Sequence, residues 1–175
     1  MRRRTAAVGS AVFFLIVPGA MAGLIPWLLT GWQLRDPLPY WLPMRVLGVI
    51  LLFAGLTVLI QAFVRFVVEG LGTPAPISPP ERLVVGGVYR YIRNPMYVAV
   101  LATIVGQVLL LGQLGLLLYT AAFWLIAAAF VRWYEEPALT RRFGADYETY
   151  RRAVPAWWPR LRPWKPSKHD EPCTR

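Results

Sequence analysis

The chain changes character at residues 86–97, which read Gly86-Gly87-Val88-Tyr89-Arg90-Tyr91-Ile92-Arg93-Asn94-Pro95-Met96-Tyr97. A Pro-rich polar loop precedes this stretch, and a long apolar run follows it. Asn94 and Pro95 predict a helix start, because Asn is a favoured N-cap and Pro at the first helical position gives up no hydrogen bond. The first-turn amides and the helix dipole then favour an anion, and Arg90 and Arg93 strengthen that field. The stretch predicts either a ligand site or a juxtamembrane anchor, since Arg and Tyr also flank membrane helices that bind nothing.

Composition places the chain among membrane proteins. Its 175 residues are 57% hydrophobic, with a mean hydropathy of +0.45, whereas soluble domains are roughly 45–50% apolar. The net charge of +10 lies mostly beside the apolar runs and in the tail. This distribution indicates contact with the anionic head groups of a lipid bilayer, and it disfavours nucleic acid as a partner.

Cysteine and histidine each occur once, as Cys173 and His169 in the polar C-terminal tail. The chain therefore predicts no intrachain disulfide and no Cys/His metal site. Histidine acid–base chemistry is excluded from the body of the protein. Any chemistry must use Tyr, Arg, Glu, Asp, Asn, backbone groups or a cofactor.

Four apolar segments predict an all-α integral membrane protein with four transmembrane helices plus a C-terminal amphipathic interfacial helix. The predicted spans are residues 8–32, 42–66, 95–111 and 114–134, with an ordered functional loop at 67–94. The first segment is also similar to a signal peptide, but its apolar character continues to Trp32, which favours a spanning helix. Lys and Arg concentrate at the N-terminus, in the long loop and in the C-terminal region. This asymmetry predicts a multi-pass inner- or plasma-membrane protein with both termini and the loop cytoplasmic.

The pattern changes again after Pro137. Phe143, Tyr147, Tyr150 and Val154 recur at helical spacing, which predicts an amphipathic helix over 138–154 that lies on the membrane or folds back over the loop. Glu148 and Arg152, four residues apart, predict an ion pair on its polar face. The following segment predicts an interfacial anchor formed by Trp157, Trp158, Arg160, Arg162, Trp164 and Lys165. We therefore expect residues 1–166 to form one domain and residues 167–175 to form a disordered tail.

Two adjacent carboxylates, Glu135 and Glu136, stand at the end of the fourth predicted span. Because that span forms a helical hairpin with the third, its end returns to the start of helix 95–111, beside Arg93. An ionisable group at such a depth is costly unless it is hydrated or paired. Pairing with Arg132 or Arg93 accounts for one of the carboxylates. Adjacent helical residues diverge by about 100°, so we expect the two carboxylates to be inequivalent.

These residues carry a resemblance to a known family. The chain resembles the integral-membrane methyltransferases that include isoprenylcysteine carboxyl methyltransferases and phospholipid N-methyltransferases. The matching strings are Gly87-Val88-Tyr89-Arg90-Tyr91-Ile92-Arg93-Asn94-Pro95-Met96-Tyr97, Tyr134-Glu135-Glu136-Pro137-Ala138-Leu139, Phe143-Gly144-Ala145-Asp146-Tyr147 and Tyr150. The isoprenylcysteine branch usually has His at the position of Asn94, so the strings look more like the phospholipid branch.

The resemblance implies an S-adenosylmethionine-dependent membrane methyltransferase that acts on a lipid or other hydrophobic acceptor at the cytoplasmic face. It implies that Arg93, Asn94 and Tyr97 hold the methionine end of the cofactor, and that Glu135 or Glu136 holds its ribose or amino group. The wider predicted cofactor-binding set is Tyr89, Arg90, Tyr91, Arg93, Asn94, Pro95, Tyr97, Glu135 and Glu136. The predicted catalytic residues are Arg93, Glu135 and Glu136, and the predicted acceptor-binding residues are Tyr147 and Tyr150.

Two other functions compete with methyl transfer. One is a membrane reductase of the sterol-reductase type that uses NADPH, although no Gly-rich phosphate loop with an acidic partner is visible in the sequence. The other is a non-catalytic membrane scaffold that uses the same basic and aromatic surfaces. Within the methyltransferase interpretation, the sequence leaves open whether the acceptor atom is oxygen or nitrogen.

Overall fold

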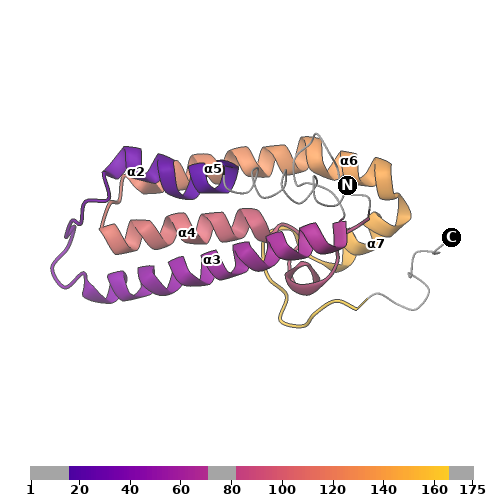
Figure 1. Ribbon diagram of the computed structural model, residues 1–175, viewed down its shortest axis with the longest axis horizontal. Helices are drawn as coiled ribbons and strands as arrows, with labels where there is room; N and C mark the ends of the chain where they lie inside the picture. The colour runs from indigo at the N-terminus through magenta and orange to yellow at the C-terminus, as the bar shows by residue number, and fades with distance from the viewer. Residues whose placement is uncertain (1–15, 71–81, 166–175) are drawn as a thin grey trace.

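The computed structural model describes residues 16–70 and 82–165, and these contain helices and no strand. The elements are listed in chain order: η1 (Ala20–Leu24), α2 (Ile25–Thr30), α3 (Leu42–Gly70), η2 (Gly87–Arg90), α4 (Pro95–Leu111), α5 (Leu116–Phe130), η3 (Val131–Glu135), α6 (Glu136–Phe143) and α7 (Ala145–Ala153). The all-helical prediction is confirmed for this part of the chain. In Figure 1, α3 and α4 lie side by side, and α2 with α5 and α6 forms a second layer above them.

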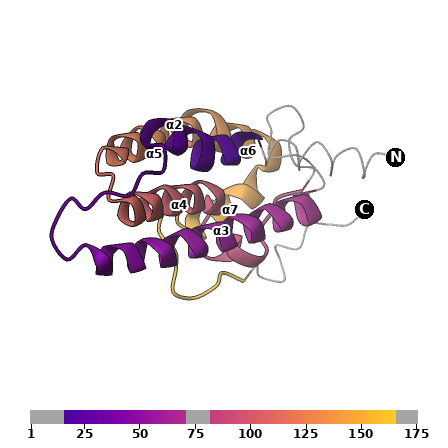
Figure 2. The same cartoon turned by 60° about the vertical axis from the view of Figure 1, so that its left-hand side comes forward.

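The α3–α4 pair is the most closely packed part of the bundle, and the turned view in Figure 2 shows the same pairing. Glycines allow this approach. A Cβ added at Gly48 would lie 2.7 Å from the Gly106 carbonyl oxygen, and one added at Gly106 would lie 2.8 Å from the Leu52 nitrogen. Small residues at helix contacts are typical of membrane bundles, where close backbone packing replaces the hydrophobic driving force.

In the part of the chain that the structure describes, two π-turns interrupt the helices, and a proline follows two residues after the end of each. The Ile25 N–H donates to the Ala20 carbonyl before Pro26, and the Glu136 N–H donates to the Val131 carbonyl before Pro137. A π-turn adds one residue to the hydrogen-bond spacing, so it can accept a proline that would otherwise break the helix.

The π-turn η3 corrects the predicted end of the fourth helix. The sequence predicts that this helix ends at residue 134, yet the helical run continues without a break from Leu116 to Phe143. The single helix predicted over 138–154 is also wrong. It is divided into α6 and α7 by Gly144, whose φ of +54° is costly for any residue with a side chain.

The predicted ion pair between Glu148 and Arg152 is replaced by one between Glu148 and Arg151, with 3.5 Å between Nη1 and Oε1. The α7 helix turns its Tyr147 and Tyr150 rings into a buried cluster with Val154. The chain here folds back over the segment that precedes α4, which is one of the two positions that the sequence allows.

Two helices, Leu42–Glu69 and Leu116–Phe143, are long and apolar enough to cross a membrane, while the apolar helices Ile16–Thr30 and Pro95–Leu111 are shorter. The predicted start of the first span, at residues 8–15, lies outside the described residues. The four-span arrangement and the sides of the termini stay predictions.

Candidate functional site

The start of α4 places Asn94 at the N-cap position and Pro95 at the first helical position, as the sequence predicts. The Asn94 carbonyl accepts a hydrogen bond from the Val98 N–H at 3.2 Å. The Asn94 side chain, however, makes no capping bond. Its Nδ2 atom is buried and has no hydrogen-bond partner among the described residues. Since an unpaired buried amide is costly, this Nδ2 is a candidate donor to a ligand.

Arg93 connects the start of α4 to the C-terminal segment. Its Nε donates to the Val154 carbonyl at 2.8 Å, and its backbone N–H donates to the Pro155 carbonyl at 2.9 Å. Its Nη1 donates to Glu136 Oε1 at 2.8 Å and to the Tyr147 hydroxyl at 3.2 Å. The side chain is only 11% exposed. Arg93 therefore holds together three segments that are distant in the sequence.

Glu136 lies at the centre of an arginine cluster. Besides Arg93, Arg151 approaches its Oε2 at 3.3 Å and Arg132 approaches it at 3.6 Å. The Glu136 side chain is 9% exposed. Both arginines that the sequence offers as partners are present, and Arg151 is a third. A carboxylate so buried and so fully paired serves first to hold the site together.

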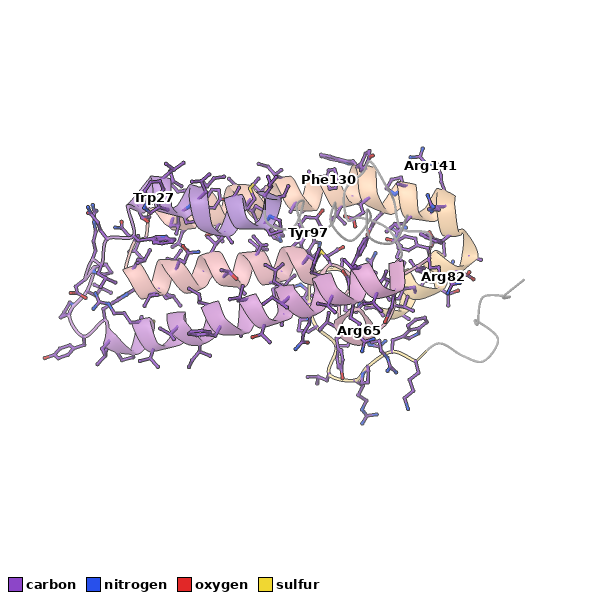
Figure 3. All side chains as sticks on the ribbon, viewed as in Figure 1. Trp27, Arg65, Arg82, Tyr97, Phe130 and Arg141 are labelled. Atoms are coloured by element: carbon purple, nitrogen blue, oxygen red, sulfur yellow. The ribbon has the colours of Figure 1, made fainter. Side chains whose placement is uncertain are left out.

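Glu135 has a different environment, as expected for adjacent helical residues. The Tyr97 hydroxyl donates to Glu135 Oε2 at 3.3 Å, and Figure 3 shows Tyr97 at the start of α4, facing the α5–α6 layer. The described residues offer Glu135 no ion pair. The Tyr97 ring centre lies 6.3 Å from that of Trp157, which lies 6.4 Å from that of Trp124. Glu135 therefore lies at one end of a row of aromatic rings formed by Tyr97, Trp157 and Trp124.

Tyr147 and Tyr150, the predicted acceptor-binding residues, are each 3% exposed and belong to the core cluster around Val154. The Tyr150 hydroxyl donates to the Tyr89 carbonyl at 2.7 Å. Burial raises the pKa of both phenols above its ordinary value. At neutral pH they are protonated hydrogen-bond partners and not bases. The acceptor-binding role that the sequence predicts for them stays a prediction.

Arg90 and Tyr91 lie outside the Arg93 cluster, whereas Tyr89 is close enough to Glu135 that, besides burial, this carboxylate raises the pKa of the Tyr89 phenol. Tyr89 is buried against α3, with its hydroxyl 3.5 Å from the Ala62 carbonyl. Burial raises the pKa of its phenol well above its ordinary value. Arg90 donates from Nε to the Trp164 carbonyl at 2.6 Å. Arg90 and Tyr91 line a separate groove against α3.

Residues 43–146, more than half of the chain and including every residue from Arg93 to Glu136, match the family model described as phospholipid methyltransferase. The chain belongs to this family. Membership in the phospholipid methyltransferase family favours methyl transfer over the reductase and scaffold alternatives.

The chain is also similar to the protein-S-isoprenylcysteine O-methyltransferase of Schizosaccharomyces pombe. It is 36% identical over 78 residues, which are 44% of this chain and 33% of the relative. The match therefore spans about one third of the relative's length. No solved structure matches the chain.

Sequence reasoning missed three parts of this candidate site. Arg151 could have been found, because it shares the polar side of the C-terminal helix with Glu148. Trp157 was predicted to be a membrane anchor, and no sequence pattern separates it from Trp158. The Val154 and Pro155 carbonyls that hold Arg93 leave no trace in the sequence at all, since every residue carries a carbonyl.

Proposed function

We propose that this chain transfers a methyl group from S-adenosylmethionine to a lipid or other hydrophobic acceptor at the cytoplasmic face of a membrane. One observation carries the proposal. At the start of α4, Tyr97 meets Glu135 at the end of η3, and Arg93 meets Glu136 at the start of α6. Beside Arg93, the Asn94 amide stays buried and unpaired among the described residues. Family membership supports methyl transfer, and the distribution of Lys and Arg supports the cytoplasmic face.

The residues present fit the cofactor. Its carboxylate suits the Asn94 Nδ2 donor and the first-turn N–H groups of α4, because a helix start leaves such donors without partners. Its amino group or ribose hydroxyls suit Glu135, which the described residues leave without an ion pair. Bound there, S-adenosylmethionine supplies a methyl group activated by a positively charged sulfur.

The protein's own contribution is positioning. Arg93 is fixed by four hydrogen bonds, to the carbonyls of Val154 and Pro155 and to the side chains of Glu136 and Tyr147. Groups held this firmly can orient a reacting pair, and near-ideal orientation supplies up to ~7–11 kcal/mol of a barrier. Because the cluster is buried, it also keeps water from the reacting centre.

Proton transfer falls to the carboxylates if the acceptor is an amine. The phenols of Tyr147 and Tyr150 stay protonated, because burial raises their pKa, and Glu136 is already shared by three arginines. Glu135 is then the residue that can take a proton. A carboxylate acceptor needs no such base.

Ligand binding to the purified protein in detergent tests this function. S-adenosylhomocysteine should raise the unfolding temperature, and NADPH should not. The reverse result would favour the reductase, and no response to either compound would favour a scaffold. Radiolabelled S-adenosylmethionine with a lipid extract then reports which acceptor is methylated.

A matched pair of substitutions at Asn94 tests the site. The Asn94 side chain makes no capping bond that a substitution could remove, and Asn, Ser and Asp are all favoured at the N-cap position, so Asn94→Ser and Asn94→Asp should both fold. We expect Asn94→Ser to bind S-adenosylhomocysteine with modest loss. Asn94→Asp should lose at least about tenfold, since a carboxylate there repels the ligand's carboxylate. Parent-like binding by Asn94→Asp, with normal helicity, would place the ligand's carboxylate elsewhere.

A further inference from the structure

A groove of about 570 Å³ lies between the end of α3 and the segment that precedes α4. Its lining comes from α3, η2 and the C-terminal segment and consists of Ile60, Gln61, Val64, Arg65, Gly87, Val88, Arg90, Tyr91 and Pro163. None of these residues belongs to the cluster of Arg93, Asn94, Tyr97, Glu135 and Glu136. Figure 3 shows Arg65 at the end of α3 where the C-terminal segment passes.

Two guanidinium groups give the groove an excess of positive charge. Arg65 Nη1 pairs with Glu69 Oε1 at 3.0 Å, but Glu69 also accepts the Gly86 N–H at 2.9 Å, so its charge is shared. Arg90 uses Nε for the Trp164 carbonyl. The described residues offer its terminal nitrogens no carboxylate. The Arg65 side chain also lies against Gly87, where an added Cβ would be 2.9 Å from its Nε.

The same groove has an apolar side. Ile60 is 48% exposed and Val64 is 50% exposed, and both belong to a helix long and apolar enough to cross a membrane. Outside the lining of the groove, the C-terminal segment also exposes apolar side chains, with Leu161 100% and Trp158 79% exposed. A groove with hydrocarbon along a spanning helix and guanidinium groups at its end complements an amphiphile that has an anionic head.

We propose that this groove binds an anionic membrane phospholipid, with its phosphate between Arg65 and Arg90 and an acyl chain along Ile60 and Val64. Guanidinium groups bind phosphate through charge-assisted and often bidentate hydrogen bonds. The Tyr91 hydroxyl and the Gln61 amide add polar contacts at the level of the head group. This assigns Arg90 and Tyr91 to lipid binding and leaves cofactor binding to the Arg93 cluster.

Backbone hydrogen bonds through the C-terminal segment connect the groove to the Arg93 cluster. The Trp164 N–H donates to the Arg90 carbonyl at 2.9 Å, and the Arg160 N–H donates to the Tyr91 carbonyl at 2.9 Å. The same C-terminal segment supplies the Pro155 carbonyl to the Arg93 N–H. A lipid that bridges α3, η2 and this segment therefore stabilises the fold around Arg93 without touching it.

Lipid binding to the purified protein in a maltoside detergent tests the proposal, with native mass spectrometry to count bound lipids and thermal unfolding to measure stabilisation. Phosphatidylglycerol should bind and raise the unfolding temperature, while phosphatidylcholine and inorganic phosphate should not. Arg65→Gln and Arg90→Gln should each weaken phosphatidylglycerol binding roughly fivefold, the effect typical of one basic residue at an anionic lipid surface. Arg65→Lys should restore most of it.

Arg152→Gln is the matched control, because Arg152 is exposed on α7 and removing it changes the net charge equally. It should bind lipid like the parent. Equal losses in Arg152→Gln and Arg65→Gln, or equal stabilisation by phosphatidylcholine or by inorganic phosphate, would overturn the proposal. Arg65→Gln keeps the test decisive if Arg90→Gln fails to fold. None of these measurements uses S-adenosylmethionine, so their outcome is independent of the proposed methyl transfer.

Discussion

The two π-turns, η1 and η3, have the same backbone hydrogen-bond pattern but different side chains. Each has five residues, and in each the residue before a proline donates its N–H to the carbonyl five positions earlier. In η1 the side chains are apolar, Ala-Met-Ala-Gly-Leu, whereas η3 reads Val-Arg-Trp-Tyr-Glu and leads directly into Glu136.

The bundle supports the two turns differently. At η1, side chains of other helices come to the backbone: Gln107 Nε2 donates to the Ala22 carbonyl at 2.6 Å, and the Tyr119 hydroxyl donates to the Met21 carbonyl at 2.7 Å. At η3, the turn's own end supplies carboxyl groups to Arg93 and Tyr97. These contacts at η1 therefore use backbone carbonyls, whereas the carboxyl groups at the end of η3 are those that the proposed function uses.

Glu136→Gln should have the largest effect, because it removes the charge that holds Arg93, Arg132 and Arg151 together. Breaking a buried ion pair from one side typically costs about 3–5 kcal/mol. We expect a loss of that order in the free energy of unfolding, measured in mixed detergent micelles. Arg132→Gln is the control, since Arg132 is 67% exposed and 3.6 Å away, and should cost about 0–1 kcal/mol. Equal effects would show that Glu136 is a surface carboxylate.

Glu135→Gln should leave the unfolding temperature close to that of the parent. The amide oxygen still accepts the Tyr97 hydroxyl, but the charge for the ligand is gone. We expect S-adenosylhomocysteine to bind ten- to a hundredfold more weakly, in line with about 1.5–3 kcal/mol for a charge-assisted hydrogen bond. Titration calorimetry in detergent measures this loss. If Glu135→Gln unfolds the protein and binds normally when folded, the roles of the two carboxylates are exchanged.

Gln107→Leu should destabilise η1 without affecting ligand binding. The Ala22 carbonyl loses its donor, but the buried Gln107 Oε1, which has no partner among the described residues, is removed as well. Hydrogen bonds between membrane helices average only ~0.6 kcal/mol, so we expect a loss of about 1 kcal/mol in stability. S-adenosylhomocysteine affinity, measured in the same preparation, should not change. A tenfold loss of affinity would mean that η1 also contributes to the site.

Residue patterns predict the helix that starts at Pro95 and the meeting of Arg93 with Glu136, because caps, charges and hairpin geometry are local signals. They do not predict η3, since the cost of Pro137 is decided by packing and not by its neighbours in sequence. In the sequence, Gly144 is notable only as part of a string that matches the family. In the structure, its positive φ separates α6 from α7. The separation of Arg90 from Arg93 is also decided by tertiary contacts, because Arg90 donates to the Trp164 carbonyl and Arg93 donates to the Val154 carbonyl.

Tyr97→Phe should have the smallest effect of the substitutions at the candidate site. It tests whether the Tyr97 hydroxyl orients the Glu135 carboxylate, separately from the charge of that carboxylate. Phenylalanine keeps the ring beside Trp157 and removes only the hydroxyl, which donates to Glu135 at 3.3 Å. At that length we expect about 0.5–1 kcal/mol, or a two- to fivefold loss of S-adenosylhomocysteine affinity. Tyr119→Phe is the matched control, because it loses one phenol hydrogen bond at η1 and should not change affinity.

The double variant Glu135→Gln with Tyr97→Phe completes the comparison. If the hydroxyl only orients the Glu135 carboxylate, its removal should matter little once the charge is gone, and the two losses should fall short of their sum. Independent groups would add to within about 0.3–0.5 kcal/mol. Additive losses would mean that Tyr97 contacts the ligand directly. Equal losses in Tyr97→Phe and Tyr119→Phe would remove the distinction between η1 and η3.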